Sequence, residues 1–177
     1  MKTLLVVHIR ILAQRQCLNN RVTEDDRYLL AAIGLAQQAR DNGNHPFGAL
    51  LVDPDGNVVV ESENTTVTLR DCTGHAETNV MRVASERFDY EFLQGCTLYT
   101  STEPCAMCAG AIFWGNVRRV VFALSERDLR RIAGHNQENA TLAIPCREIF
   151  ARGNHEVEVS GPHLQEQARG VHEGFWD

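Results

Sequence analysis

Two short segments of the chain carry residue types that bind metals, and they constrain the possible folds most. The first contains His75 and Glu77, and the second contains Pro104, Cys105 and Cys108. One imidazole and two thiolates suit zinc, and three protein ligands leave the fourth tetrahedral position open. The sequence therefore predicts a fold that brings His75, Cys105 and Cys108 together around one Zn²⁺ per chain, although Cys105 lies 30 positions after His75.

The spacing within each segment suggests different tasks for its residues. Cys105 and Cys108 are three residues apart and would share one face of a helix, with Pro104 in its first turn. The positive end of that helix would favour the thiolates that bind metal. Glu77 is two residues from His75 and would not face the same way along a helix. We therefore predict that Glu77 moves protons at the open metal position as the catalytic residue.

A closed structural zinc site is the alternative interpretation. Cys72 lies three residues before His75, so Cys72, His75, Cys105 and Cys108 could be the four ligands of a non-catalytic zinc module. That arrangement gives Glu77 no task. A chain of 177 residues should also bury a core without the help of a metal.

The two segments resemble the H-x-E…P-C-x-x-C signature of the zinc-dependent cytidine and deoxycytidylate deaminase-like superfamily. The similarity extends over Thr102–Cys105, Gly110–Trp114 and Pro46–Ala49, and it is nearest to bacterial guanine deaminases and related nucleobase and nucleoside deaminases. The resemblance implies an enzyme that converts an exocyclic amino group to a carbonyl with release of ammonia. In this family the glutamate of the H-A-E motif is the general acid and base, and Glu77 matches it.

The resemblance also implies contacts with the substrate. Asn64 stands 11 residues before His75, the separation at which relatives carry an asparagine that contacts the base. Phe47 and Trp114 match aromatic positions that flank the base in bacterial guanine deaminases, and Ala76 lies within the H-A-E motif. A loop role for Asn64 and a core role for both aromatic residues are the alternatives. The glycine that follows Phe47 would permit close approach of the backbone to a ligand.

Guanine or a related amino-purine is the leading substrate prediction, because Pro46–Ala49 and Gly110–Trp114 look most like guanine deaminase. The chain departs from those enzymes beyond the fourth strand, where they carry an acidic pair after a glycine and this chain has Gly134–Gln137. An amide presents a donor as well as an acceptor, so it need not bind guanine as a carboxylate does. Cytosine, a purine nucleoside or a triazine therefore stays an alternative.

Deamination of adenosine in tRNA is a further alternative, and the charge pattern weighs against it. The formal net charge is −6, whereas binding to a phosphate backbone depends on clustered Lys and Arg. Acidic residues interrupt the local basic cluster, which consists of Arg118, Arg119, Arg127, Arg130 and Arg131. We expect a small-molecule substrate and no nucleic acid.

The resemblance implies a homodimer, since members of the family are usually dimers. The chain ends in Phe175, Trp176 and Asp177, an apolar pair followed by an acid. An apolar pair at a chain end suggests docking, either as a lid over the site or against a second subunit, with simple fraying as the alternative.

The composition is that of one globular domain, with 44% hydrophobic and 23% charged residues. We predict an N-terminal extension of unknown role at residues 1–22 and a single zinc deaminase domain at 23–177. His8 and Arg10 interrupt the apolar start, which disfavours a signal peptide, and no stretch approaches the length of a membrane span. Of six cysteines only the pair in P-C-x-x-C shows ligand spacing, so a cytoplasmic protein without disulfides is expected.

The hydrophobic pattern predicts an α/β fold. Helices are expected from a cap at Thr23 to about residue 41 and at 75–88, 104–114 and 162–175, and strands at 47–52, 57–61, 97–101, 117–124 and 156–160. The first two strands would form a hairpin, and the alternation of strands and helices from residue 97 onward implies parallel pairing. The prediction is a five-stranded mixed sheet in a three-layer α/β/α sandwich, which is also the cytidine deaminase-like fold that the resemblance implies. Residues 125–145 give no clear pattern.

Overall fold

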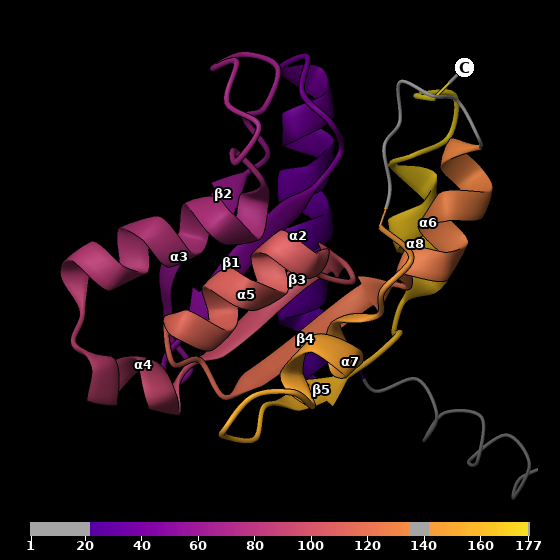
Figure 1. Ribbon diagram of the computed structural model, residues 1–177. Helices are drawn as coiled ribbons and strands as arrows, with labels where there is room; N and C mark the ends of the chain where they lie inside the picture. Colours follow the sequence, from indigo (N-terminus) through magenta and orange to yellow (C-terminus); the bar gives the residue numbers. More distant parts are fainter. Residues whose placement is uncertain (1–21, 135–141, 177) are drawn as a thin grey trace, which may run out of the picture.

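The computed structural model describes residues 22–134 and 142–176, and in this part of the chain five strands form one mixed sheet (Figure 1). The strands are β1 (Gly48–Val52), β2 (Val58–Glu63), β3 (Thr97–Thr102), β4 (Arg119–Leu124) and β5 (Glu158–Ser160). Their order is β2-β1-β3-β4-β5, in which β1 is antiparallel to β2 and β3 while β3, β4 and β5 are parallel. The predicted mixed sheet is confirmed.

Helices cover both faces of the sheet (Figure 1). One core cluster joins the sheet to α3 (Ala76–Arg87), α4 (Tyr90–Gly95), α5 (Ala106–Trp114) and α7 (Cys146–Phe150). The second joins the opposite face to α2 (Glu24–Asp41), α6 (Glu126–Ala133) and α8 (Gln165–Gly170). Strand β4 contributes to both, because successive side chains point to opposite faces: Phe122 packs in the first cluster and Val121 in the second.

Local sequence explains where α2 begins. The Thr23 hydroxyl accepts from the backbone N–H of Asp26 at 3.0 Å, and the Asp26 carboxylate accepts from the backbone N–H of Thr23 at 2.8 Å. This reciprocal capping box satisfies two donors that a helix start would otherwise leave free. The buried side of α2 then recurs every three or four residues, as in Leu29, Ala32 and Ala36. In the described parts of the chain, the helices are too short or too polar to span a bilayer.

The structure differs from the predicted elements in five places. Helices α4 and α7 were not predicted, and α6 occupies part of the stretch that had no clear pattern. The closing helix is shorter than predicted, because Leu164 has a positive φ of 49° and α8 begins after it. Pro104 lies before the N-cap of α5 rather than in its first turn, since Cys105 is the N-cap. Helices of six residues such as α4 and α8 span too few turns to show a clear period.

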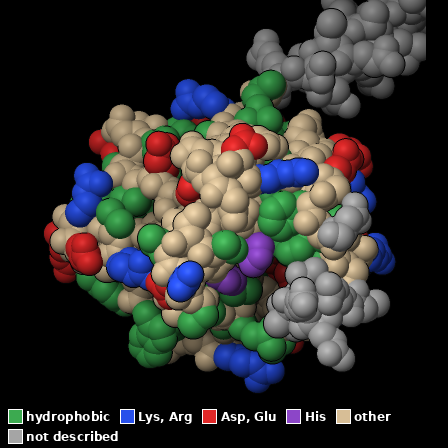
Figure 2. All heavy atoms as spheres, turned by 90° about the horizontal axis from the view of Figure 1, so that it is seen from above, with side chains coloured by type: hydrophobic (Ala, Val, Ile, Leu, Met, Phe, Trp, Pro, Cys, Tyr) green, Lys and Arg blue, Asp and Glu red, His purple; other side chains and the backbone are tan. Residues whose placement is uncertain are grey.

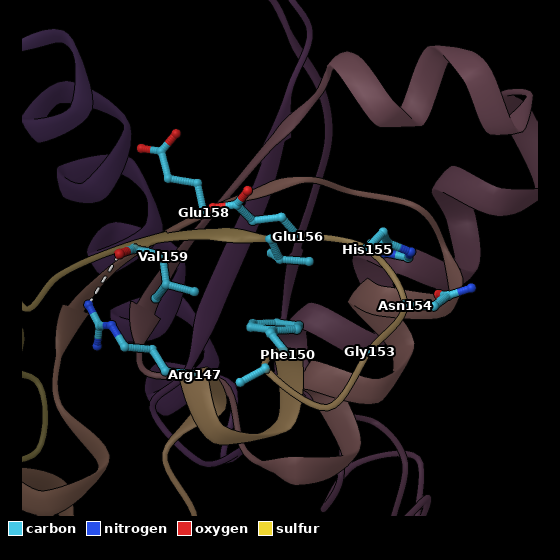
Figure 3. A pocket seen from close by; sticks show the side chains of 10 residues that line it. Arg147, Phe150, Gly153, Asn154, His155, Glu156, Glu158 and Val159 are labelled. Atoms are coloured by element: carbon cyan, nitrogen blue, oxygen red, sulfur yellow. Dashed lines mark hydrogen bonds between the residues drawn. The ribbon is translucent and has the colours of Figure 1, made fainter.

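Strand β5 forms one edge of the sheet and has only three residues. Arg147 of α7 lies over this edge, and its Nη2 donates to the carbonyl oxygen of Val159 at 3.2 Å (Figure 3). The same Nη2 donates to the carbonyl oxygen of Gly161 at 2.9 Å. An open cavity of about 630 Å³ lies beside it, lined by residues of α7, β5 and the loop between them.

Candidate active site

The N-terminal ends of α3 and α5 meet beside the C-terminal end of β3. His75 is the N-cap residue of α3, Cys105 is the N-cap residue of α5, and Cys108 lies in the first turn of α5. Neither N-cap side chain makes a capping hydrogen bond to its own helix. Their ring and thiol are therefore free to face each other across the junction of the two helices.

The three donor atoms form a triangle of the size that zinc requires. His75 Nδ1 is 3.6 Å from Cys105 Sγ and 3.5 Å from Cys108 Sγ, and the two sulfur atoms are 3.6 Å apart. Tetrahedral zinc with bonds of about 2.3 Å to sulfur and about 2.0–2.1 Å to nitrogen places its ligands roughly 3.5–3.8 Å from one another. The residues fit a zinc ion with one open position, and they form a candidate metal site.

The two thiols differ in their readiness to lose a proton. The hydrogen bond that they share, together with the bond to His75, lowers the pKa of Cys105 to about 4. The same shared bond and burial raise the pKa of Cys108. Because a thiol binds zinc only as the thiolate, the pair already carries one of the two charges that metal binding needs.

Glu77 lies next to the metal ligands on the first turn of α3. Its carboxylate accepts from the Thr100 hydroxyl at 3.2 Å and from the Cys108 thiol at 3.5 Å, and the residue is 6% exposed. Burial raises the pKa of Glu77, and the negative charge of Cys105 adds to this effect. A carboxyl with a raised pKa beside an open metal position is suited to accept and return protons.

A cavity of about 480 Å³ opens onto these residues. Its described lining combines the metal ligands His75 and Cys105 with acidic, apolar and aromatic side chains: His45, Phe47, Cys72, Glu77, Thr102, Glu103, Met107, Glu126, Leu129, Ala133, Leu142 and Trp176. The view from above shows histidine side chains grouped among hydrophobic ones on one face of the molecule (Figure 2). Such a mixture of apolar walls and a few polar groups is typical of sites for small molecules.

Aromatic residues from both ends of the described chain form one wall of the cavity. The ring of Trp176 lies 5.6 Å from His45 and 6.3 Å from Phe47, measured between ring centroids. Trp176 Nε1 donates to Nδ1 of His172 at 3.3 Å, and His172 also packs against Phe47 at 5.4 Å. The described part of the C-terminal segment thus docks against its own chain at the cavity, as the apolar pair at the chain end suggested.

Comparison with known proteins identifies the family of the chain. Residues 22–124 match the model of the cytidine and deoxycytidylate deaminase zinc-binding region. The chain belongs to this family. Its members are zinc-dependent hydrolytic enzymes that act on nucleobases or nucleosides, so the chain is a zinc-dependent deaminase.

Three relatives show the range of substrates among similar proteins. A Schizosaccharomyces pombe protein described as a probable cytosine deaminase is 45% identical over 155 residues, which are 87% of this chain and 93% of that protein. Guanine deaminase of Bacillus subtilis is 38% identical over 104 residues, 58% of this chain and 66% of its own length. A structure from a study of A-to-I editing by tRNA:A34 deaminases has 30% identity and a TM-score of 0.63, covering 82% of this chain and 98% of that one.

The predicted substrate contacts of the deaminase lie at different distances from the cavity. Phe47 lines it, whereas Ala76 is buried in the core and is not among the described lining residues. Asn64 is fully buried, and its backbone N–H donates to the carbonyl oxygen of Phe47 at 2.9 Å. The Oδ1 atom of Asn64 accepts from Thr66, but its Nδ2 has no partner among the described residues. Asn64 itself is not among the described residues that line the cavity.

The structure does not bring Trp114 to the cavity. Trp114 is the last residue of α5, whose N-cap residue Cys105 is at the metal site, and the nine-residue helix places Trp114 roughly 12 Å from its first residue along the axis. Its side chain is 80% exposed. The sequence predicted that Gly48 would let the backbone approach a ligand closely. In the structure Gly48 packs closely against α2 instead, because a Cβ at this position would collide with the backbone of Ala32 and Ala36.

Cys72 does not join the metal site in the deaminase. Its side chain is exposed and lines the cavity, but it lies outside the group of metal-binding atoms formed by His75, Cys105 and Cys108. Within the described residues, the geometry thus favours three protein ligands over the four-ligand structural alternative. The segment His135–Gln137 and Asp177, which the sequence analysis singled out, lie outside the described residues, as do residues 1–21.

Several cavity residues were missed from the sequence. His45, Met107, Glu126 and Leu129 line the cavity. Met107 lies between the two cysteines of the metal motif, whereas the other three lie outside both metal-binding segments. Glu126 and Leu129 follow β4, and the parallel order of β3 and β4 places the ends of both strands at the same edge of the sheet. The sequence analysis predicted this parallel order. The position of Glu126 just after β4 could therefore have indicated that it lies near the metal site.

Proposed function

We propose that this deaminase removes the exocyclic amino group of a free nucleobase, with cytosine as the first candidate. The observation that carries the proposal is one cavity in which candidate metal ligands, Glu77 and an aromatic wall meet. Its volume of about 480 Å³ suits a small planar molecule. The S. pombe relative supports cytosine, because its similarity extends over 87% of the chain.

In the proposed mechanism His75, Cys105 and Cys108 hold the zinc ion, which when bound supplies a water that ionises near neutral pH. Glu77 accepts a proton from the water and returns it to the ring nitrogen beside the reacting carbon. The second proton of the water ends on the departing amine. The oxygen becomes the carbonyl oxygen, and one ammonia is released for each water consumed. The hydrogen bond from Thr100 keeps the Glu77 carboxylate in place.

The aromatic wall and a buried amide would hold the base. Phe47 and Trp176 present ring surfaces to the cavity, and stacking of a base on an aromatic side chain contributes about 1–3 kcal/mol. The unpartnered Nδ2 of Asn64 is a donor for a ring nitrogen or carbonyl oxygen of the substrate. Because Trp176 is among the described residues that line the cavity and Trp114 is not, we propose that Trp176 takes the stacking role predicted for Trp114.

Guanine and tRNA adenosine are the alternative substrates. Guanine led the prediction from sequence motifs, and the B. subtilis relative keeps it as a candidate, but that similarity extends over only 58% of the chain. The structure from the study of tRNA deaminases supports the second alternative. The net charge of −6 opposes it, as does the lack of Lys and Arg among the described residues that line the cavity.

We also propose that the deaminase is a homodimer, as the family resemblance implied, and that Trp114 lies in the contact, because its side chain is 80% exposed at the end of α5. Sizing chromatography of the protein and of Trp114→Ser tests this. A monomeric protein, or a Trp114→Ser variant that stays dimeric, would show that Trp114 does not serve this purpose.

The proposed function is tested by ammonia release from zinc-loaded protein with cytosine, guanine, adenine, their nucleosides and tRNA. We expect turnover of a free base and none of tRNA. Glu77→Gln should lower kcat by about 10²–10⁴-fold with one zinc still bound, because general acid–base catalysis contributes that much. Activity on tRNA alone, or loss of zinc in Glu77→Gln, would contradict the proposal.

A further inference from the structure

Glu126 is a carboxylate in the cavity for which the proposed chemistry has no use. It is the first residue of α6 and lines the cavity together with Glu77 and Glu103. Glu103 is fully occupied: it accepts from the backbone N–H of Glu126 at 3.1 Å and from the backbone N–H and thiol of Cys146 at 3.2 and 3.4 Å. The Glu126 carboxylate, by contrast, has neither a hydrogen bond nor an ion pair with any described residue.

The surroundings make an unpartnered carboxylate at this position costly. Burial raises the pKa of Glu126 to about 7, and the negative charges of Cys105 and Glu103 add to this effect. Arg130 acts in the opposite direction but does not form an ion pair with it. A ligand that donates a hydrogen bond to the ionised carboxylate would offset this cost.

The rest of the described lining is suited to a small neutral base. It contains histidines, thiols, apolar side chains and three glutamates, and no Lys or Arg that would hold a phosphate. A free base and its nucleoside differ at one ring nitrogen, which carries a hydrogen in the base and the sugar in the nucleoside. Only the free base presents an N–H donor there, so an acceptor in the cavity could distinguish the two.

We propose that Glu126 accepts a hydrogen bond from this ring N–H and thereby selects free bases over nucleosides and nucleotides. The inference rests on the proposed deaminase function and deepens it, because it names the substrate class and the residue that recognises it. A site built to bind an N–H group rejects an analogue that lacks it, since the buried acceptor is then left unpaired. Glu126 is thus a specificity-determining residue, whereas Glu77 performs the chemistry.

The test compares cytosine with 1-methylcytosine, which lacks only the N–H in question, and guanine with 9-methylguanine. The zinc-loaded protein should prefer the free base by about tenfold or more in kcat/KM. Glu126→Ala should lose about 10- to 100-fold on the free base and little on the methylated base, so that the preference disappears. Glu148→Ala is the matched control, because Glu148 is an exposed acid in the first turn of α7 and outside the described cavity lining. It should change neither value.

A binding measurement separates this inference from the proposed function. Calorimetry with the zinc-loaded Glu77→Gln variant should show tighter binding of cytosine than of 1-methylcytosine. In the double variant Glu77→Gln with Glu126→Ala, the two bases should bind with equal affinity. Equal affinities of the Glu77→Gln variant for the two bases, or binding of neither base to it, would overturn the role of Glu126. An equal loss of kcat/KM on both bases in Glu126→Ala would do the same. Ammonia released from the two bases at equal rates by the unaltered protein would overturn it too, while leaving the deaminase function standing. Failure to release ammonia from any free base, with the binding difference intact, would instead contradict the proposed reaction.

Discussion

Replacing His172 with glutamine should change how the stability of the deaminase depends on pH. The side chain is fully buried between Phe47 and Trp176, and its Nδ1 accepts the Trp176 N–H. Burial, with a smaller effect of the nearby charge of Arg40, lowers the pKa of His172 from 6.5 to about 4. Protonation would place an unpaired charge in the core and remove the acceptor of the Trp176 bond.

The sign and size follow from the difference in pKa between the folded and unfolded states. Between pH 6.5 and about 4 the unfolded chain binds a proton at His172 that the folded chain does not, so stability is fully present above pH 6.5 and falls as the pH falls. Each pKa unit corresponds to about 1.4 kcal/mol, which gives a loss of about 2 kcal/mol at pH 5 and about 3 kcal/mol in total.

Urea unfolding of zinc-saturated protein at pH 7.5, 6.5, 5.5 and 5.0 measures this effect. His172→Gln is expected to be less stable at pH 7.5, because it loses the packing of the ring, but to lose about 2 kcal/mol less than the unaltered protein on going to pH 5. Protonation of carboxylates and of zinc ligands affects both proteins alike, so the difference isolates His172. Parallel stability curves for the two proteins would refute the reasoning.

Three further changes test other parts of the structure. Cys72→Ser should leave one zinc per chain and an unchanged melting temperature, because Cys72 lies outside the metal site. Loss of the zinc in metal analysis of this variant would support the four-ligand alternative instead. Asp25→Asn should lower the free energy of unfolding by about 1–2 kcal/mol, because it removes an ion pair with Arg119 at 2.8 Å and weakens the bond from Tyr99. No change in urea unfolding would show that desolvation offsets this pair, whose side chains are 30% and 31% exposed. Gly48→Ala should destabilise by about 1–3 kcal/mol or more, since its Cβ would force β1 away from α2, and an unchanged melting temperature would contradict that close packing.

The metal site was predictable because its information is local. The two cysteines are held by one helix turn, and His75 precedes Glu77 by a fixed step, so only the meeting of α3 and α5 had to be supplied by the fold. Helix α3 follows β2 and α5 follows β3, and these two strands run in the same direction because both are antiparallel to β1. The sequence analysis predicted parallel pairing only from residue 97 onward, so the position of α3 beside α5 was not part of that prediction.

The walls of the cavity were harder to predict because they depend on contacts between distant parts of the chain. Trp176 meets His45 across 131 positions of sequence, and neither has a local pattern that points to the other. Trp114 matches a family motif, but the predicted helix at 104–114 already placed it at the end away from the cysteines, and the structure agrees with the helix rather than with the motif. Gly48 was predicted to let the backbone approach a ligand, but in the structure the close approach is to helix α2 of the same protein.

The contact of Arg147 with the edge of the sheet limits how the protein can associate with others. An edge strand with free carbonyl oxygens invites pairing with a strand of another molecule. At β5 the outward carbonyl oxygens of Val159 and Gly161 are occupied by a charged side chain, and the strand has only three residues. A foreign strand would have to displace the guanidinium and then find little backbone to pair with. Lengthening of the sheet at this edge is thus disfavoured, and stable association there would have to come from helices and side chains.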